Sequence, residues 1–221
     1  MHTISISDNL ARKVPDIQLS CIECEVLTEK VNKHLWSVIQ NKINELSIKL
    51  KVEDVSKIPS ISASRRGYKA CGKDPARYRL SAEALLRRVV KSSEIYQINN
   101  VVDLLNLVSI STGFSIGGYD AEKIEGDIIF GIGEKNEPYT GIGRGKLNIE
   151  FLPVFRDAIG AFGTPTSDSV RTSVSLETKR FLMIIVDFGG EELQLSEATD
   201  LAVALLEKYA GAVNFEIKLI K

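Results

Sequence analysis

Hydroxyl, amide and backbone groups dominate the two stretches of this sequence that could do chemistry. In the first stretch, Asp103, Asn106 and Ser109 recur every three residues within an otherwise apolar segment, a spacing that places them on one face of a helix. Buried polar groups need hydrogen-bond partners, because each unpaired group costs about 1–3 kcal/mol. The three side chains therefore either pin a neighbouring loop or line a ligand pocket, and the sequence leaves both possibilities open.

The second stretch is AIGAFGTPTSDSVRTS, residues 158–173. It is rich in serine and threonine and has a single carboxylate, Asp168, and a single cation, Arg171. Hydroxyls and backbone amides are better suited to placing water or contacting a ribose than to proton transfer by a tuned acid or base. A surface loop that leads into the next strand is the alternative interpretation.

Histidine and cysteine chemistry has little support in this sequence. His34 lies beside an apolar helical stripe and His2 lies near the start of the chain, so neither is a good candidate for a general base. Cys21 and Cys24 have a C-x-x-C spacing, but they lie in a strand-like run without a second pair. Small buried residues are the better interpretation, and we expect no metal and no cofactor.

A basic segment interrupts a chain whose net charge is only −1. Between Arg65 and Lys91 there are nine basic and two acidic residues, with tyrosines among them. Such a segment is either a solvated helix face or a phosphate-binding surface, and tyrosines beside cations favour RNA because bases stack on aromatic rings. The predicted phosphate contacts are Arg65, Arg66, Lys73, Arg77 and Arg79.

The elements that would position these residues alternate between helix and strand. Predicted helices run from Thr28 to about Leu50, from Ser81, from Asn99 or Asn100 to Gly113, and from Ser196 to about Gly211. Predicted strands are residues 3–7, 17–26, Phe181–Phe188 and 213–219, with a β-rich stretch from Asp127 to Val154. Residues 53–72 are expected to be irregular, and GGYD, residues 117–120, to be a glycine turn.

These elements indicate an α/β protein of the mixed α+β type, with compact mixed sheets flanked by helices. We expect one domain over residues 1–221, with the charge-free Phe181–Phe188 strand in the middle of a sheet and a strand–helix–strand crossover near the carboxyl end. No apolar run approaches the roughly 18 residues needed to span a bilayer, and the start of the chain lacks a secretion signal. A cytoplasmic protein without a membrane partner is the prediction.

The order of these features resembles a known family. KDPARYRLSAEALLRR, VDLLNLVSISTGFSIGGYDAEKIEGDI and PTSDSVRTS follow one another as in the tRNA-editing module of the phenylalanyl-tRNA synthetase beta subunit, its fused third and fourth domains. The resemblance covers roughly residues 65–188, and a free-standing bacterial branch of the family is more similar still. It implies a protein that binds tRNA and hydrolyses mischarged aminoacyl-tRNA in trans. It does not imply aminoacylation, since that machinery lies in other domains.

The resemblance also assigns roles to particular residues. It implies that the catalytic groups are Asn106, Thr166, Ser167 and Asp168. It implies that the substrate pocket is formed by Gly117, Gly118, Tyr119, Asp120 and Gly163. The sequence departs from the family at Leu105, where a threonine is usual, and at Gly117, where a histidine is usual.

Three hypotheses of function remain open on the sequence. The first is hydrolysis of mischarged aminoacyl-tRNA, the second is tRNA binding without catalysis, and the third is a small-molecule pocket for a free amino acid. If Asp168 faces the pocket, an Asp168→Ala variant should lose preference between tyrosyl and phenylalanyl esters. If Asp168 instead caps its own loop, that preference should be unchanged. The cognate amino acid, the tRNA and the oligomeric state do not follow from the sequence.

Overall fold

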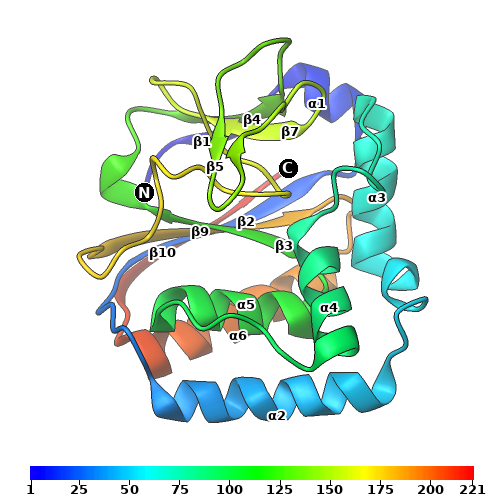
Figure 1. The fold of residues 1–221 in the computed structure, drawn as a ribbon. Helices are drawn as coiled ribbons and strands as arrows, with labels where there is room; N and C mark the ends of the chain where they lie inside the picture. The colour runs from blue at the N-terminus through cyan, green and yellow to red at the C-terminus, as the bar shows by residue number, and fades with distance from the viewer.

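A central antiparallel sheet lies between a layer of helices and a second sheet (Figure 1). The computed structural model describes residues 1–221. Its helices are α1 (Asp8–Lys13), α2 (Lys33–Lys49), α3 (Pro59–Cys71), α4 (Ser81–Ser92), α5 (Asn100–Thr112) and α6 (Glu192–Ala210), with short 3-10 turns η1 (Val55–Lys57) and η2 (Ala121–Lys123). Its strands are β1 (Ile4–Ile6), β2 (Gln18–Glu25), β3 (Ser115–Asp120), β4 (Ile128–Ile132), β5 (Thr140–Gly141), β6 (Gly145–Lys146), β7 (Pro153–Arg156), β8 (Ala161–Gly163), β9 (Arg180–Asp187) and β10 (Val213–Ile220).

The two larger sheets differ in their topology. The central sheet has the order β10-β2-β9-β3, and every neighbouring pair in it is antiparallel. The second sheet has the order β1-β4-β7-β8, and its β1–β4 pair is parallel. Helices α2, α5 and α6 cover the face of the central sheet that points away from the second sheet (Figure 1). This arrangement confirms the predicted mixed α+β class.

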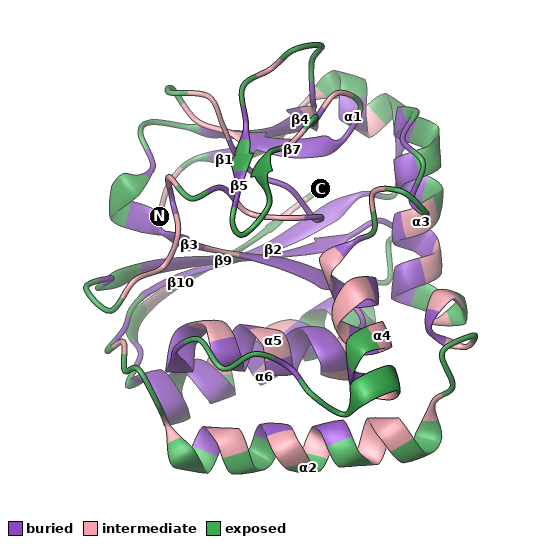
Figure 2. Ribbon diagram, in the orientation of Figure 1, coloured by how far each residue is buried: buried purple, intermediate pink, exposed green.

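Strand β9 separates two hydrophobic cores. Its residues Phe181, Met183 and Ile185 face the helices, and the alternate residues 182, 184 and 186 face the second sheet. All six are buried, as Figure 2 shows for the middle of the molecule. A strand covered on both faces can be apolar throughout its length, which is why the uncharged run predicted a central strand correctly.

The crossover near the carboxyl end is also confirmed. Strands β9 and β10 are each antiparallel to β2, which lies between them, so they run parallel to each other and α6 connects them. Gly211 ends α6 in the left-handed conformation, as predicted. The helix starts earlier than predicted, because Glu191 rather than Ser196 is its N-cap residue.

The pair Cys21 and Cys24 lies in β2, on opposite faces of the sheet. Both thiols are buried, and this burial raises the pKa of each to about 12. Side chains on opposite faces of a strand cannot share a ligand, so the C-x-x-C spacing reflects core packing, as predicted.

The segment predicted to be irregular, residues 53–72, instead contains α3. Pro59 is the first residue of this helix, and Gly72 ends it with a positive φ of 98°. Within α3, Gly67 lies against the ring of Phe188, so closely that a Cβ atom there would be only 2.3 Å from the ring. Packing against the sheet therefore outweighs the low helix propensity of its serine and glycine residues.

Two other predicted boundaries move. Helix α2 is capped by Asn32, whose side chain accepts from the Leu35 amide, and Thr28 instead donates to the Thr178 carbonyl at 2.9 Å. The GGYD segment is part of β3 rather than a turn, since each of its residues pairs with β9. No helix in the structure has both the length and the apolar character needed to cross a membrane.

Candidate functional site

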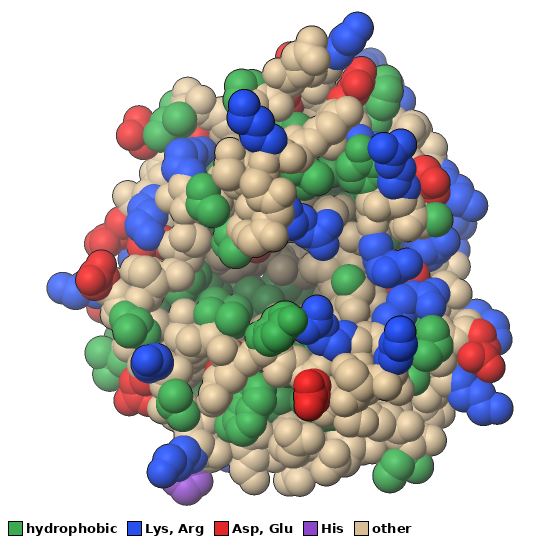
Figure 3. Space-filling view, viewed as in Figure 1, with side chains coloured by type: hydrophobic (Ala, Val, Ile, Leu, Met, Phe, Trp, Pro, Cys, Tyr) green, Lys and Arg blue, Asp and Glu red, His purple; other side chains and the backbone are tan.

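A cavity of about 390 Å³ lies between α4, α5, the edge strand β3 and the loop that follows β8. Its volume is within the range of small-molecule sites. Figure 3 shows this face hollowed near its centre, with Lys and Arg side chains gathered on one side of the hollow. We call the α4–α5 side, with the connecting residues 96–98, the helix wall, and the side formed by residues 142–144 and 166–167 the loop wall.

Helix α4 contributes a single helical face to the helix wall. Ser81, Ala84, Leu85 and Arg88 line the cavity, at the i, i+3, i+4 and i+7 spacing of one face. The buried face of α4 is instead Ala82, Leu86 and Val89. Ala84 and Leu85 therefore face the cavity rather than the core.

The polar stripe of α5 performs both of the predicted tasks. Asp103 accepts a hydrogen bond from the Ile98 amide at 2.8 Å, and Ser109 donates to the Phe114 carbonyl at 2.8 Å, so both pin chain segments next to the helix. Burial raises the pKa of Asp103 to about 6. Asn106 is half-buried, has no hydrogen bond to the rest of the protein and lines the cavity. Asn106 is thus the member of the stripe that is free to bind a ligand.

The position of α5 follows from its two ends. Asn99 caps the first turn by accepting from the Val102 amide at 2.9 Å, and Gly113 ends the helix with a φ of 78°. Asn100, the first residue of the helix, is fully buried and donates to the carbonyls of Leu27 and Tyr209, each at 2.9 Å. These bonds fix the helix against β2 and α6, and so fix the direction in which Asn106 points.

Three buried tyrosines hold the loop wall. They come from α3, from β3 and from the segment before β5, and each hydroxyl contacts a different one of three consecutive loop residues. The contacts are Tyr68 with the Thr166 hydroxyl at 2.9 Å, Tyr139 with the Ser167 carbonyl at 2.6 Å, and Tyr119 with the Asp168 carboxylate at 2.9 Å. Thr166 and Ser167 line the cavity. Tyr68 therefore holds the Thr166 hydroxyl in place, and Tyr139 holds the backbone of Ser167.

Asp168 does not occupy either of the positions predicted for it. Its carboxylate accepts the hydrogen bond from Tyr119 and is not among the groups that line the cavity. It also does not cap its own loop with its side chain. Burial raises the pKa of Asp168 to about 7, although the hydrogen bonds from Tyr119 and from the Gly118 amide act in the opposite direction. The residue is a structural partner of a core tyrosine.

Two of the three glycines predicted to shape a pocket, Gly117 and Gly163, pack around Tyr119 instead. A Cβ atom at Gly117 would lie 2.1 Å from the Tyr119 hydroxyl oxygen, and one at Gly163 would lie 2.2 Å from it. Gly118 is on the opposite face of β3, where a Cβ atom would be 2.5 Å from Leu105. Neither these three glycines nor Tyr119 lines the cavity. Gly117 and Gly163 lie behind the loop wall and leave room for Tyr119 to reach Asp168.

The fifth predicted pocket residue, Asp120, is at the far end of β3. Its carboxylate accepts from the Glu122 amide at 3.3 Å and from the Thr178 hydroxyl at 2.8 Å, and it forms an ion pair with Lys123 at 3.2 Å. It caps η2 and does not line the cavity.

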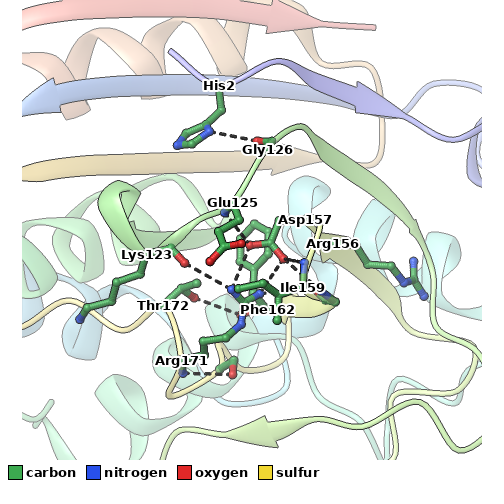
Figure 4. Close-up of polar contacts among 12 residues, drawn as sticks. His2, Lys123, Glu125, Gly126, Arg156, Asp157, Ile159, Phe162, Arg171 and Thr172 are labelled. Atoms are coloured by element: carbon green, nitrogen blue, oxygen red, sulfur yellow. Dashed lines mark hydrogen bonds and ion pairs between the residues drawn. The ribbon is translucent and has the colours of Figure 1, made fainter.

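Arg171 anchors the distal end of the loop. Its guanidinium group binds the Asp157 carboxylate through two nitrogens, at 2.9 and 2.8 Å, as Figure 4 shows. Asp157 in turn accepts from the amides of Glu125, Ile159 and Gly160. The single cation of this loop is therefore used within the protein.

The predicted phosphate contacts separate into three groups. Arg65 and Arg79 surround the buried carboxylate of Glu83, at 2.8 and 3.9 Å, and Arg87 joins them at 2.9 Å. Arg66 and Arg77 are exposed. Three guanidinium groups around one carboxylate leave an excess of positive charge on this surface, which is the electrostatic property that phosphate binding requires.

Lys73 forms the third group. It is only 7% exposed, donates to the carbonyls of Asn148 and Glu150, and lies 3.8 Å from the centre of the Tyr78 ring. A side chain held in this way is not a surface contact for phosphate. Desolvation lowers the pKa of Lys73, in keeping with its burial.

Three residues of the cavity escaped the sequence analysis. Arg88 lies over the exposed ring of Tyr96 at 4.2 Å, and both line the helix wall. Arg144 lines the opposite wall, from the tip of the β5–β6 hairpin. For Arg88 the sequence held a signal, because its helical spacing from Ser81 places both residues on one face of α4. Neither Tyr96 nor Arg144 has a local pattern that marks it, because the tertiary fold alone brings them to the cavity.

The chemistry of the cavity is that of hydrogen bonding and anion binding. Its lining supplies hydroxyls, the amide of Asn106 and the guanidinium groups of Arg88 and Arg144, but no carboxylate and no histidine. The structure contains no cluster of three or more His, Cys, Asp or Glu side chains that could hold a metal ion. Such a lining can bind an anionic or ester-bearing ligand and place a water molecule.

Comparison with known proteins gives matches to several solved structures and to one family. An N-terminal fragment of the phenylalanyl-tRNA synthetase beta subunit from Pyrococcus horikoshii has a TM-score of 0.49 and 14% sequence identity. The match covers 99% of this chain and 50% of that fragment, so the chain spans about half the length of its structural relative. No curated protein matches the sequence. The model of the B3/4 domain matches residues 63–211, roughly two thirds of the chain, and this protein therefore belongs to the B3/4 domain family.

Proposed function

We propose that the cavity binds the aminoacyl end of a charged tRNA and hydrolyses the ester bond between the amino acid and the ribose. The observation that carries this proposal is a cavity lined by Asn106, Thr166 and Ser167 that opens beside the arginine-rich surface of α3 and α4. Membership of the B3/4 family supports a tRNA-related role. We do not propose that this chain attaches amino acids to tRNA, as a complete synthetase does.

In the proposed reaction, a water molecule attacks the carbonyl carbon of the ester. The bond from this carbon to the ribose oxygen breaks, the amino acid leaves as a carboxylic acid, and the ribose oxygen takes up a proton from the water. An aminoacyl ester is already activated, so holding water and ester in the correct geometry supplies much of the rate enhancement. This requirement suits a lining without a histidine or a carboxylate.

The two walls have different tasks in this mechanism. Asn106 on the helix wall orients the water or the ester carbonyl through its amide. Thr166 and Ser167 on the loop wall contact the ribose or the water, while Tyr68 holds the Thr166 hydroxyl and Tyr139 holds the Ser167 carbonyl. The apolar side chains of Leu85, Leu105 and Ile116 complete the lining and would contact the amino-acid side chain.

Recognition of the tRNA would use the cationic surface beside the cavity. Arg66 and Arg77 are exposed, and Arg65 and Arg79 keep part of each guanidinium group in solvent around Glu83. These groups would neutralise backbone phosphates, while Arg88 and Tyr96 at the cavity offer a cation and a ring for the terminal nucleotides. An aminoacyl-tRNA substrate implies action in the cytoplasm.

The test is deacylation of a panel of misacylated tRNAs. We expect at least one ester to be hydrolysed faster than the spontaneous rate, and an Asn106→Ala variant to lose about tenfold in rate. An Asn44→Ala variant, which changes an exposed asparagine on α2, is the matched control and should retain the rate. Spontaneous rates for every ester in the panel would exclude the hydrolase.

Binding of tRNA without catalysis is the second candidate, and one observation favours it. The lining has an apolar Leu105 beside Asn106, and it contains no group that could act as a general base. Under this hypothesis the protein binds tRNA at low salt but deacylates none of the panel. Replacing Arg77 and Arg79 by alanine should then weaken binding and flatten its salt dependence. Absence of binding at low salt would contradict both candidates.

A further inference from the structure

Strand β10 forms an open edge of the central sheet. It pairs with β2 on one side, and no strand or helix hydrogen-bonds to its other side. Three of its apolar side chains, Val213, Ile217 and Leu219, are 53%, 49% and 46% exposed. An open edge of this kind presents unpaired amide and carbonyl groups in a row, ready to accept another strand.

The two faces of β10 have different chemistry. Phe215, Ile217 and Leu219 are on the face that α6 covers in the neighbouring strands, where Ile217 pairs with Ile22 of the helix-side core. Glu216 and Lys218 are on the opposite face. The strand is therefore amphipathic along an edge that has no partner.

We propose that β10 pairs antiparallel with β10 of a second copy of this chain, around a two-fold axis at Ile217. In this register Ile217 lies opposite itself, Phe215 opposite Leu219, and Glu216 opposite Lys218 of the other copy. The apolar pairs continue the helix-side layer from one copy to the other. The Glu216–Lys218 pair forms twice, once on each side of the axis. The two central sheets then form one continuous sheet of two copies.

Other registers are less favourable for a physical reason. A shift of one residue turns the apolar face of one copy toward the charged face of the other. A shift of two residues keeps the faces aligned but puts Glu216 opposite Glu216 or Lys218 opposite Lys218 of the other copy. Like charges directly opposite each other are destabilising. The proposed register alone combines aligned faces with opposite charges at the centre of the strand.

The amino end of β10 limits the pairing to the central and carboxyl-terminal part of the strand. A register shift separates Val213 from Glu216, and Asn214 has a φ of 57°. From Glu216 to Ile220 the ladder with β2 is regular. Glu216 also contacts the amino group of Met1 at 2.7 Å, and this amino group lies 3.9 Å from Glu23 of β2.

Pairing through β10 leaves the candidate site open. The cavity lies beside β3, which is the opposite edge of the same sheet, with β2 and β9 between the two edges. The proposed dimer therefore has two independent cavities at its outer ends. The inference does not depend on the proposed hydrolase, and deacylation should be the same in dimeric and monomeric forms.

The experiment is sedimentation of the full chain over a wide range of concentrations. We expect reversible association to twice the chain mass of 24.4 kDa. The single variants Glu216→Lys and Lys218→Glu each replace two attractive pairs by two repulsive ones, and should weaken association on the order of tenfold. The double variant with both changes exchanges the charges and should restore association.

Three further observations make the outcome decisive. Glu53→Lys makes the same change of charge at an exposed position outside β10 and should leave association unaltered. Ile217→Arg places two cations at the axis and should give a monomer, with unfolding transitions confirming that each variant is folded. A monomer at every concentration, or a dimer that ignores both single charge reversals, would overturn the proposal.

Discussion

The two walls of the cavity differ in how far their polar side chains are already committed. On the loop wall, tyrosine hydroxyls from three separate elements bond to the three residues from Thr166 to Asp168. On the helix wall, the side chain of Asn106 has no hydrogen bond to the protein. Arg88, on the same wall, lies over the ring of Tyr96. Residues 166–167 of the loop wall are thus held in place, whereas the helix wall presents free groups.

This difference distinguishes residues that build the site from residues that would bind a ligand. A preorganised surface reduces the entropy that binding must otherwise overcome, whereas a free amide or guanidinium group can form new hydrogen bonds. Substitutions behind the loop wall should therefore change stability, and substitutions on the helix wall should change binding or rate.

The largest expected effect is behind the loop wall, at Gly117. A Gly117→Ala change places a methyl group 2.1 Å from the hydroxyl oxygen of the fully buried Tyr119, so we expect a loss of about 3 kcal/mol in the free energy of unfolding. Urea unfolding measures this loss. Gly118→Ala on the opposite face of β3 is the control, because it meets the flexible end of Leu105 and should cost about 1 kcal/mol. Equal losses would contradict the packing role of Gly117.

The next effect is a pH dependence that comes from Asp168. Its folded pKa of about 7 is above the unfolded value of about 3.9, so the folded state binds more protons between these values. The stability that this group contributes is complete below about pH 4 and is lost as the pH rises toward 7. Between pH 5 and pH 8 the loss should be about 2 kcal/mol, at about 1.4 kcal/mol per pKa unit and allowing for partial exposure.

An Asp168→Asn variant isolates this contribution. Its amide oxygen can still accept from Tyr119 but does not titrate, so the variant should lose less stability than the wild-type protein over the same pH range. The raised pKa of Asp103 acts in the same direction in both proteins and cancels in the comparison. If the stabilities of the variant and the wild-type protein changed in parallel with pH, Asp168 would have to stay ionised when the protein folds.

A smaller effect distinguishes the two walls directly. Tyr68→Phe removes the hydrogen bond to Thr166 and should lower stability by about 1 kcal/mol, together with the deacylation rate. Asn106→Ala removes no bond within the protein and should change stability by less than about 0.5 kcal/mol while it lowers the rate. Thermal unfolding and single-turnover deacylation of the same samples test the pair. A destabilised Asn106→Ala protein would remove the distinction between the walls.

The smallest effect is expected at the tip of the β5–β6 hairpin. Arg144 lines the cavity, and Arg144→Ala should weaken tRNA binding a few-fold and reduce the salt slope by about one. Lys146, which is exposed on the same hairpin but does not line the cavity, provides the control. Filter binding over a salt series measures both variants, and an equal response would indicate diffuse attraction to the hairpin.

Local sequence patterns determined most elements of this fold. The apolar run in β9 predicts a central strand because both of its faces are covered, and Asn99 and Gly113 predict the ends of α5 because capping depends on neighbouring residues only. The stripe that contains Asn106 follows from helical periodicity in the same way. Helix α3 could not be predicted with the same rules, since its serines and Gly67 disfavour a helix and packing against Phe188 stabilises it.

Only the tertiary structure decided which polar residues face the cavity. The family resemblance assigned Gly117, Tyr119 and Asp168 to the site, yet they form a buried contact behind the loop wall. Lys73 belongs to a basic segment but donates its hydrogen bonds inside the protein, whereas Arg144 reaches the cavity from a distant hairpin. Sequence fixes the side-chain types and their local periodicity, but the direction of a side chain depends on contacts between segments that are far apart in the chain.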